Sequence, residues 1–131
     1  RASALKGNHG RYVVLAAAFQ LDPGHDPAEL NARMSALVSH RKRTQPPGAS
    51  LGSMFKNPPG DYAGRLIEAA GLKGTTIGGV QISPVHANFF INIGGGTAAD
   101  YRALIALAQE RVEQASGVRL ELEIELVGDF D

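Results

Sequence analysis

The residues with the clearest potential for chemistry lie in one short segment, 48–60. Glycines there allow backbone conformations closed to other residues, and prolines restrict the chain. These shaping residues are Pro47, Gly48, Gly52, Pro58, Pro59 and Gly60. Ser53 follows Gly52, so a ligand has room to approach both the hydroxyl and the backbone, while Lys56 and Asn57 add a cation and an amide. We expect a stiff loop, neither helix nor ordinary strand, that forms a site; the alternative is a surface turn whose serine bonds its own backbone.

Residues 48–52 also match the G-x-S-x-G pattern of a hydrolase nucleophile elbow, with Ser50 as the nucleophile. That elbow joins a buried strand to a helix, whereas loop-like sequence lies on each side of Ser50. Asp61 and His86 follow in the order of a catalytic triad, but the spacing leaves no room for the units which that fold places between them. A serine hydrolase therefore remains a rival interpretation, and labelling with a fluorophosphonate tests it.

Two other patterns were candidates for ligand sites. The four histidines, at positions 9, 25, 40 and 86, lack metal-ligand spacing among themselves or with paired carboxylates, so we predict no metal site. Three glycines at 94–96 precede a helical pattern, a place where a phosphate can bind. No Lys-Ser or Lys-Thr pair follows them as in a P-loop, and we interpret them as a connector.

Composition excludes several classes of protein. The 131 residues, 44% of them hydrophobic, suffice for one domain with a core. Thirteen basic residues balance thirteen acidic ones, so the chain as a whole has no field that would attract nucleic acid or an anionic membrane. The absence of cysteine excludes disulfides and thiolate chemistry. No apolar run is long enough to cross a bilayer, and we expect a cytoplasmic protein.

The first third of the chain predicts a strand and a helix. Residues 11–21 are a near-continuous apolar run, which is typical of a buried strand. Asp26 and Pro27 suit the start of a helix over 27–42, which ends in three cations that favour a helix C-terminus. Its expected buried stripe is Leu30, Met34, Leu37 and Arg41. Because the strand-like sequence follows almost at once after Arg1, we expect a piece of a longer protein.

The remainder predicts two more helices and three strands. A short helix is expected to begin at a cap by Asp61 and to end at Gly71. Strands are expected at 76–82 and 88–93. Thr97 and Asp100 suit a capping box for a helix over 98–115, which Gly117 ends.

The last element shows the most regular pattern. Residues 118–128 alternate apolar and polar, which indicates a strand with Glu121, Glu123 and Glu125 on its polar face. The element order then predicts an α+β fold, a two-layer packing of helices on a small mixed β-sheet.

Several motifs together resemble a known family. They are GSMFKNPPGDYAGRLIEAAGLKG at 52–74 with RKRTQP before it, HANFFIN at 86–92, and the closing LELEIELVG. Their order and content resemble the flavin-dependent UDP-N-acetylenolpyruvoylglucosamine reductases, over nearly the whole chain. The opening RASALK is similar to the family's Tyr-Arg-x-Ser segment, with the Tyr just outside this chain. The short segment before the first helix, which has no tyrosine, is similar to the subtype without a tyrosine-bearing loop.

The resemblance implies an enzyme of peptidoglycan synthesis. Such enzymes reduce UDP-N-acetylglucosamine enolpyruvate to UDP-N-acetylmuramate: NADPH reduces FAD, and the flavin passes hydride to C3 of the enolpyruvyl group. Residues 1–22 would be the C-terminal tail of the FAD-binding domain and 23–131 the substrate-binding domain. Most flavin contacts in the family belong to the preceding domains, missing here, so we expect the fragment alone to be inactive.

The resemblance also implies roles for single residues. Ser53 stands at the family's proton-donor serine, Arg1 at its catalytic arginine and Glu123 at its C-terminal catalytic glutamate. The family positions that bind the UDP-sugar are occupied by Arg41, Asn57, Lys73 and His86. A non-catalytic nucleotide-sugar binding module is the second rival: it would need Arg41, Asn57 and Lys73 but not Ser53.

Overall fold

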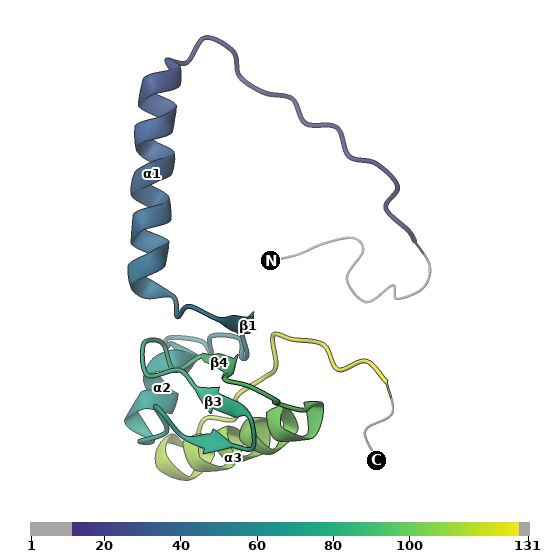
Figure 1. Cartoon of the computed structure of the whole chain (residues 1–131). Coiled ribbons are helices and arrows are strands. Elements are labelled where there is room, and N and C mark those ends of the chain that lie inside the picture. Colours follow the sequence, from purple (N-terminus) through teal and green to yellow (C-terminus); the bar gives the residue numbers. More distant parts are fainter. Residues whose placement is uncertain (1–11, 129–131) are drawn as a thin grey trace. The chain divides into compact units, whose positions relative to one another are not determined.

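The computed structural model describes residues 12–128. The chain divides into two compact units, Arg1–Arg33 and Met34–Asp131, and each is described by itself. The second unit contains the whole β-sheet and the two helices that cover it (Figure 1).

In the first unit, the apolar run expected to be a buried strand is extended and exposed. Residues 12–20 have no regular secondary structure, and Val13, Leu15 and Phe19 are 82%, 91% and 84% exposed. The strand prediction is therefore wrong for the described part of this run; Arg11 lies outside the described residues. The physical reason is that a strand needs a neighbour for its backbone groups, and the sheet within residues 12–128 contains only the four strands given below.

Helix α1 (Pro27–Thr44) begins where the sequence predicts. Asp26 Oδ1 accepts a 3.0 Å hydrogen bond from the amide of Ala28, as an N-cap does. The expected buried stripe is wrong, because no residue of α1 is buried, and Leu30, Met34 and Leu37 are 48%, 59% and 63% exposed. Helical periodicity identifies which face is apolar, but burial also requires a partner surface.

The sheet has four short strands in the order β1-β4-β3-β2. They are β1 (Ala49–Ser53), β2 (Thr76–Ile77), β3 (Val80–Ile82) and β4 (Phe89–Asn92). The α+β class is confirmed, but every described ladder is antiparallel, so the sheet is not mixed. The segment expected as a loop contains β1, although Gly48, Gly52 and Gly60 all have positive φ. The single strand expected at 76–82 is a hairpin, because Gly78, with φ +52°, permits a two-residue turn.

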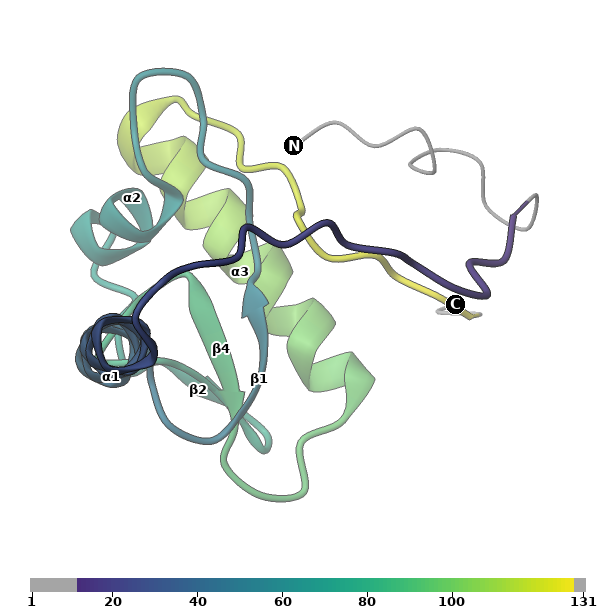
Figure 2. The same ribbon diagram turned by 90° about the horizontal axis from the view of Figure 1, so that it is seen from above.

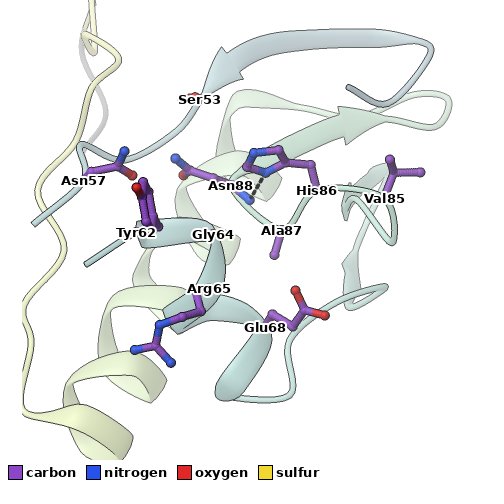
Figure 3. A pocket seen from close by; sticks show the side chains of 10 residues that line it. All are labelled: Ser53, Asn57, Tyr62, Gly64, Arg65, Glu68, Val85, His86, Ala87 and Asn88. Atoms are coloured by element: carbon purple, nitrogen blue, oxygen red, sulfur yellow. Dashed lines mark hydrogen bonds between the residues drawn. The ribbon is translucent and has the colours of Figure 1, made fainter. Parts of the chain in front are cut away.

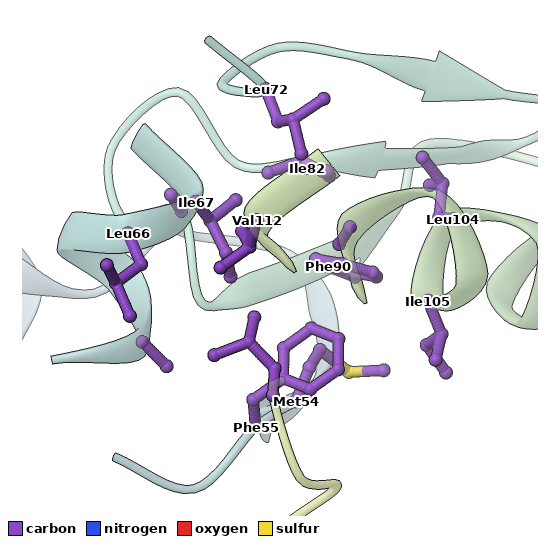
Figure 4. Close-up of a cluster of buried hydrophobic side chains, with 14 of the residues drawn as sticks. Met54, Phe55, Leu66, Ile67, Leu72, Ile82, Phe90, Leu104, Ile105 and Val112 are labelled. Atoms are coloured by element: carbon purple, nitrogen blue, oxygen red, sulfur yellow. The ribbon is translucent and has the colours of Figure 1, made fainter. Parts of the chain in front are cut away.

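Helices α2 (Ala63–Ala69) and α3 (Ala98–Ser116) bury their apolar stripes in a shared core with the sheet. Figure 2 shows the two helices beside the sheet. The cluster in Figure 4 joins the sheet, both helices and the segment after β1. Its largest fully buried members include Met54, Phe55, Ile67, Ile82, Phe90 and Leu104. Phe55 and Phe90 meet edge to face with ring centroids 6.1 Å apart, a favourable aromatic geometry.

The N-terminus of α3 is tied to the β2–β3 turn. The predicted capping box is confirmed: Thr97 Oγ1 accepts from the Asp100 amide at 3.2 Å, and Asp100 Oδ2 accepts from the Thr97 amide at 2.9 Å. The same carboxylate accepts from the amide of Gly79 at 3.4 Å. A Cβ on Gly79 would lie 2.3 Å from the carbonyl oxygen of Gly94, so only glycine fits there. The connection therefore depends on backbone contacts as well as caps.

The C-terminal segment differs from the strand expected at 118–128. It forms one isolated antiparallel bridge, Phe55 with Leu122, and the amide of Lys56 donates to the Glu121 carbonyl at 2.8 Å. The alternation still governs burial at Leu120, which is 2% exposed, but Leu126 is 45% exposed. The ladder cannot extend far because the partner chain continues into Pro58 and Pro59, which have no amide hydrogen.

Candidate functional site

A β-bulge aims the side chain of Ser53. Ser50 pairs with Ile91 and Ser53 with Phe89, so three steps along β1 match two along β4. Gly52, with φ +81°, accommodates the extra residue. Ser53 rather than Gly52 therefore stands opposite Phe89, on the face of β4 that points away from the buried Phe90. Without the bulge this position would carry no hydroxyl.

Ser53 opens onto a cavity of about 430 Å³ (Figure 3). The residues that line it are Ser53, Asn57, Tyr62, Gly64, Arg65, Glu68, Val85, His86, Ala87 and Asn88. Three of the residues singled out from the sequence are thus brought together: Ser53 and Asn57 from segment 48–60, and His86 from the segment between β3 and β4. The walls carry two hydroxyls, an imidazole, two amides and charged groups at the rim, which suits a ligand with polar groups.

Local hydrogen bonds hold the imidazole of His86. The hydroxyl oxygen of Ser83, which is fully buried, accepts from the amides of Val85 at 3.1 Å and His86 at 3.2 Å. His86 Nδ1 in turn accepts from the amide of Asn88 at 3.2 Å, and the ring packs on Phe89 with centroids 4.9 Å apart. An Nδ1 that accepts leaves Nε2 as the nitrogen that carries the proton. His86 can therefore offer a ligand a hydrogen-bond donor.

Asn57 has two functions at the site. Its Oδ1 accepts from the amide of Ala63 at 3.1 Å, which satisfies a free donor at the start of α2. Its NH₂ group then remains for a ligand. The expected cap by Asp61 is wrong: the N-cap residue is Tyr62, without a side-chain cap, and Asp61 Oδ1 instead accepts from the Tyr62 amide at 2.7 Å. Asn57, six residues before the first residue of α2, accepts from this helix-end amide instead of Asp61, because the proline-rich turn after Asn57 folds back.

Two ion pairs lie at the rim of the cavity. Arg65 Nε donates to Asp61 Oδ1 at 2.6 Å, and this guanidinium lowers the pKa of Asp61 from 3.8 to about 2. Lys73 Nζ lies 2.7 Å from Glu68 Oε1. Lys73 does not itself line the cavity, but its partner Glu68 does. Sequence reasoning missed the roles of Arg65 and Asn88; the spacing of four between Asp61 and Arg65 was the signal available for the first.

Arg41 lies elsewhere, at the end of α1. Its Nε donates to Gln45 Oε1 at 2.8 Å, and it lines a second cavity, of about 470 Å³. Ser50 lines that cavity too and belongs to β1. Ser50 thus lies within a strand and not at the sharp strand-to-helix turn that a nucleophile elbow needs.

Glu123 lies beside the Ser53 segment. Its amide donates to the carbonyl oxygen of Met54 at 2.9 Å, which ties the C-terminal segment to the residue after Ser53. Glu123 is not among the residues that line the cavity. Arg1, the expected catalytic cation, lies outside the described residues.

The glycines at 94–96 serve the fold. Asn92 Oδ1 accepts from the amides of Gly94 at 3.0 Å and Gly96 at 3.1 Å, so these donors are already used. This agrees with a connector rather than a phosphate loop. Across residues 12–128 there is no group of three or more His, Cys, Asp or Glu that could hold a metal ion. None of the helices in that range is both long and apolar enough to cross a bilayer.

A family model, described as the C-terminal domain of UDP-N-acetylenolpyruvoylglucosamine reductase, matches residues 43–127. The chain belongs to this family. The matched reductase domain includes the sheet, α2, α3 and all residues of the Ser53 cavity.

Curated relatives extend the likeness beyond the reductase domain. A protein named UDP-N-acetylenolpyruvoylglucosamine reductase from Synechococcus sp. (strain WH7803) is 52% identical over 98% of this chain and 41% of its own length. One of the same name from Rubrobacter xylanophilus is 49% identical over 93% of this chain and 41% of its own length. The crystal structure of the Thermus caldophilus reductase has 43% identity and a TM-score of 0.61, over 75% of this chain and 34% of that one. The chain thus spans about two-fifths of the length of the curated relatives it matches.

Proposed function

We propose that residues 23–131 are the substrate-binding domain of a UDP-N-acetylenolpyruvoylglucosamine reductase and that residues 1–22 end its FAD-binding domain. The reaction is the NADPH-dependent reduction of UDP-N-acetylglucosamine enolpyruvate to UDP-N-acetylmuramate, a step of peptidoglycan synthesis in the cytoplasm. The observation that carries the proposal is the β-bulge, which places Ser53 at the wall of a cavity whose residues all lie in the region that the family model matches. The exposed apolar run 12–20 supports the division, because such a segment is stable when another domain covers it.

The Ser53 cavity has both polar and apolar wall groups, and the chain spans only about two-fifths of the length of its curated relatives. We therefore assign the binding of FAD and NADPH to the parts of the reductase that precede this chain. The flavin, when bound there, supplies the hydride. The task of this domain is to orient the enolpyruvyl group and to handle the proton.

Ser53 is the proposed proton donor. Hydride addition at C3 of the enolpyruvyl group leaves an electron pair at C2, a much stronger base than an alkoxide. The hydroxyl O–H bond then breaks as the new C–H bond forms at C2, and the serine recovers a proton from water. Ser53 is half-buried, which limits competing water while leaving access for the ligand.

Charge control at C2 is assigned to Arg1 and Glu123. A permanent cation at Arg1 would stabilise the enolate oxygen and the substrate carboxylate. Glu123 would act with it in setting the position of charge and proton. The 2.9 Å bond from the Glu123 amide to Met54 supports this role, because it connects Glu123 to the neighbour of Ser53.

The UDP-sugar is assigned to the polar groups around the two cavities. Asn57 and His86 offer hydrogen-bond donors in the Ser53 cavity. Lys73 forms an ion pair with Glu68, which lines the same cavity. Arg41 lines the second cavity. A guanidinium suits the diphosphate because it can make paired hydrogen bonds to phosphate oxygens.

A two-step assay on the full-length protein tests the proposal. NADPH added without oxygen should bleach the flavin absorbance, and UDP-N-acetylglucosamine enolpyruvate should then restore it. Mass spectrometry should find UDP-N-acetylmuramate, heavier than the substrate by two hydrogen atoms. A flavin that stays reduced while the UDP-sugar binds would instead establish a non-catalytic binding module.

A further inference from the structure

The side chain of Asn88 is buried and fully engaged with backbone groups. Asn88 is 3% exposed, and Ser83 and Asn88 are the buried polar residues among those described. Its Oδ1 accepts from the amide of Phe55 at 2.9 Å, and its Nδ2 donates to the carbonyl of Phe55 at 2.8 Å. One side-chain amide thus pairs with Phe55 as a neighbouring strand would.

The backbone of Asn88 makes two further bonds. Its carbonyl oxygen accepts from the amide of Met54 at 2.9 Å, and its amide donates to His86 Nδ1 at 3.2 Å. Figure 3 shows the last of these bonds, from Asn88 to His86. Asn88 is therefore bonded both to the two residues that follow Ser53 and to the imidazole of His86.

The contact between Asn88 and Phe55 matters for the direction of Ser53 because it directly follows the β-bulge. The regular β1–β4 pairing ends at Ser53, immediately after the irregular stretch between Ser50 and Ser53. A bulge disrupts the local ladder, so the direction of Ser53 depends on what holds the next residues. Those residues are held by Asn88 on one side and by the C-terminal segment, through Glu123 and Leu122, on the other, and a buried amide that lost its partners would be costly. The backbone of Phe55, two residues after Ser53, is consequently held in the conformation that lets both of these hydrogen bonds form.

We propose that Asn88 is a positioning residue for the reduction: its side-chain amide, bonded to both backbone groups of Phe55, sets the direction of the Ser53 hydroxyl, and its backbone bonds Met54 and His86 Nδ1. This inference rests on the proposed function. Asn88 acts through Ser53 and His86 and transfers no proton itself.

The test uses the full-length enzyme with Asn88→Ala and Asn88→Asp. Both remove the donor to Phe55, and the second keeps the side-chain shape. We expect the reoxidation of reduced flavin by saturating UDP-sugar to slow by at least about tenfold, since small misplacements of reacting groups are costly. Flavin reduction by NADPH should stay within about twofold of wild type. In a Ser53→Ala background, Asn88→Ala should add less than about twofold, because the two residues act as one unit.

Asn92→Ala is the matched control. Asn92 also bonds backbone groups with both ends of its amide, Gly94 and Gly96 with Oδ1 and Gly96 with Nδ2, but it does not line the Ser53 cavity. It should lower thermal stability and leave reoxidation within about twofold of wild type. Equal slowing by Asn92→Ala, wild-type reoxidation in both Asn88 variants, or fully multiplicative effects with Ser53→Ala would each overturn the assignment.

Hydrogen exchange separates this inference from the proposed function. The amide of Phe55, whose acceptor is Asn88 Oδ1, should exchange faster in Asn88→Ala than in wild type or Asn92→Ala, whether or not the enzyme reduces the UDP-sugar. Unchanged exchange of this amide would refute the positioning role. If wild type itself fails to reoxidise its flavin with the substrate, the proposed reaction is wrong while the exchange result still decides what Asn88 holds.

Discussion

The amide nitrogen of Glu123 lies 2.9 Å from the carbonyl oxygen of Met54, across the contact between the C-terminal segment and the segment after β1. Because Met54 follows Ser53 directly, this bond brings the backbone of Glu123 to the edge of the candidate site. The two segments are far apart in sequence, and the bridge between Phe55 and Leu122 aligns them. Register along this contact therefore decides which glutamate neighbours the serine.

Glu123→Gln in the full-length enzyme should slow flavin reoxidation by the UDP-sugar without affecting flavin reduction. Glu121→Gln is the control, because Glu121 pairs with Lys56 at 3.0 Å and its side chain is 75% exposed. Exposed pairs contribute little, so this variant should stay within about twofold of wild type, and we expect the same of Glu125→Gln. Stopped-flow absorbance of both half-reactions gives the comparison. Similar rates in all three variants would mean that the assigned register is wrong.

Ser53→Ala should leave the reduction of flavin by NADPH intact and slow reoxidation by about 10²- to 10⁴-fold, the range that a positioned general acid contributes. Ser50→Ala, on the same strand but in the Arg41 cavity and not the Ser53 cavity, should reoxidise close to the wild-type rate when the UDP-sugar is saturating. Rapid reoxidation in Ser53→Ala would remove this residue from its role. Fluorophosphonate labelling that Ser50→Ala abolishes would favour the hydrolase interpretation.

Gly64→Ala should weaken substrate binding more than it weakens the fold. A Cβ there would lie 3.0 Å from His86 Cε1 and 3.3 Å from Nδ1, so the imidazole must shift. Alanine also favours the helical conformation of α2 by up to about 1 kcal/mol over glycine. Thermal unfolding should change little, while the apparent affinity for the UDP-sugar should fall. Unchanged affinity would show that the ring position does not matter for the ligand.

Gly79→Ala, in contrast to Gly64→Ala, should lower the stability of the fold. A Cβ on Gly79 would lie 2.3 Å from both the Gly94 carbonyl oxygen and the Gly96 nitrogen, which are backbone atoms that cannot rotate away. Overpacking of this kind costs about 1–3 kcal/mol. Denaturant unfolding should therefore show a clear loss of stability in Gly79→Ala and not in Gly64→Ala. Equal stability of the two variants would contradict the close approach of the two turns.

The Asp61 carboxylate should make stability depend on acid pH. Its pKa falls from 3.8 to about 2 because Arg65 binds the charged form, so its contribution is fully present above pH 3.8 and is lost as pH falls toward about 2. The stability difference between wild type and Asp61→Asn should consequently shrink over that window. The effect should be small and weaker in high salt, because the Arg65 side chain is 59% exposed. A difference that stays constant with pH would exclude the ion pair as its cause.

Part of the candidate site could be found from sequence because its residues stand in short motifs. Ser53, Asn57 and His86 were singled out there and do line one cavity. Asn88 was not, although it lies in the HANF motif, because its partners are the backbone groups of Met54 and Phe55. Any residue type offers those groups, so no spacing of side chains signals such a contact. Arg41 was grouped with the same site but lines a separate cavity.

By itself the sequence determined what depends on neighbours along the chain: the start of α1 at Asp26, the capping box of α3, the glycine that ends it, and the family motifs. Only the tertiary structure decided what depends on a partner from elsewhere. The run 12–20 has the side chains of a strand but no described neighbour to complete its hydrogen bonds, and the alternating C-terminal segment meets a partner interrupted by prolines. Ser53 faces its cavity because one extra residue in β1 changes which side chain stands opposite Phe89. Such pairings are set by contacts across space, which a pattern along the chain does not encode.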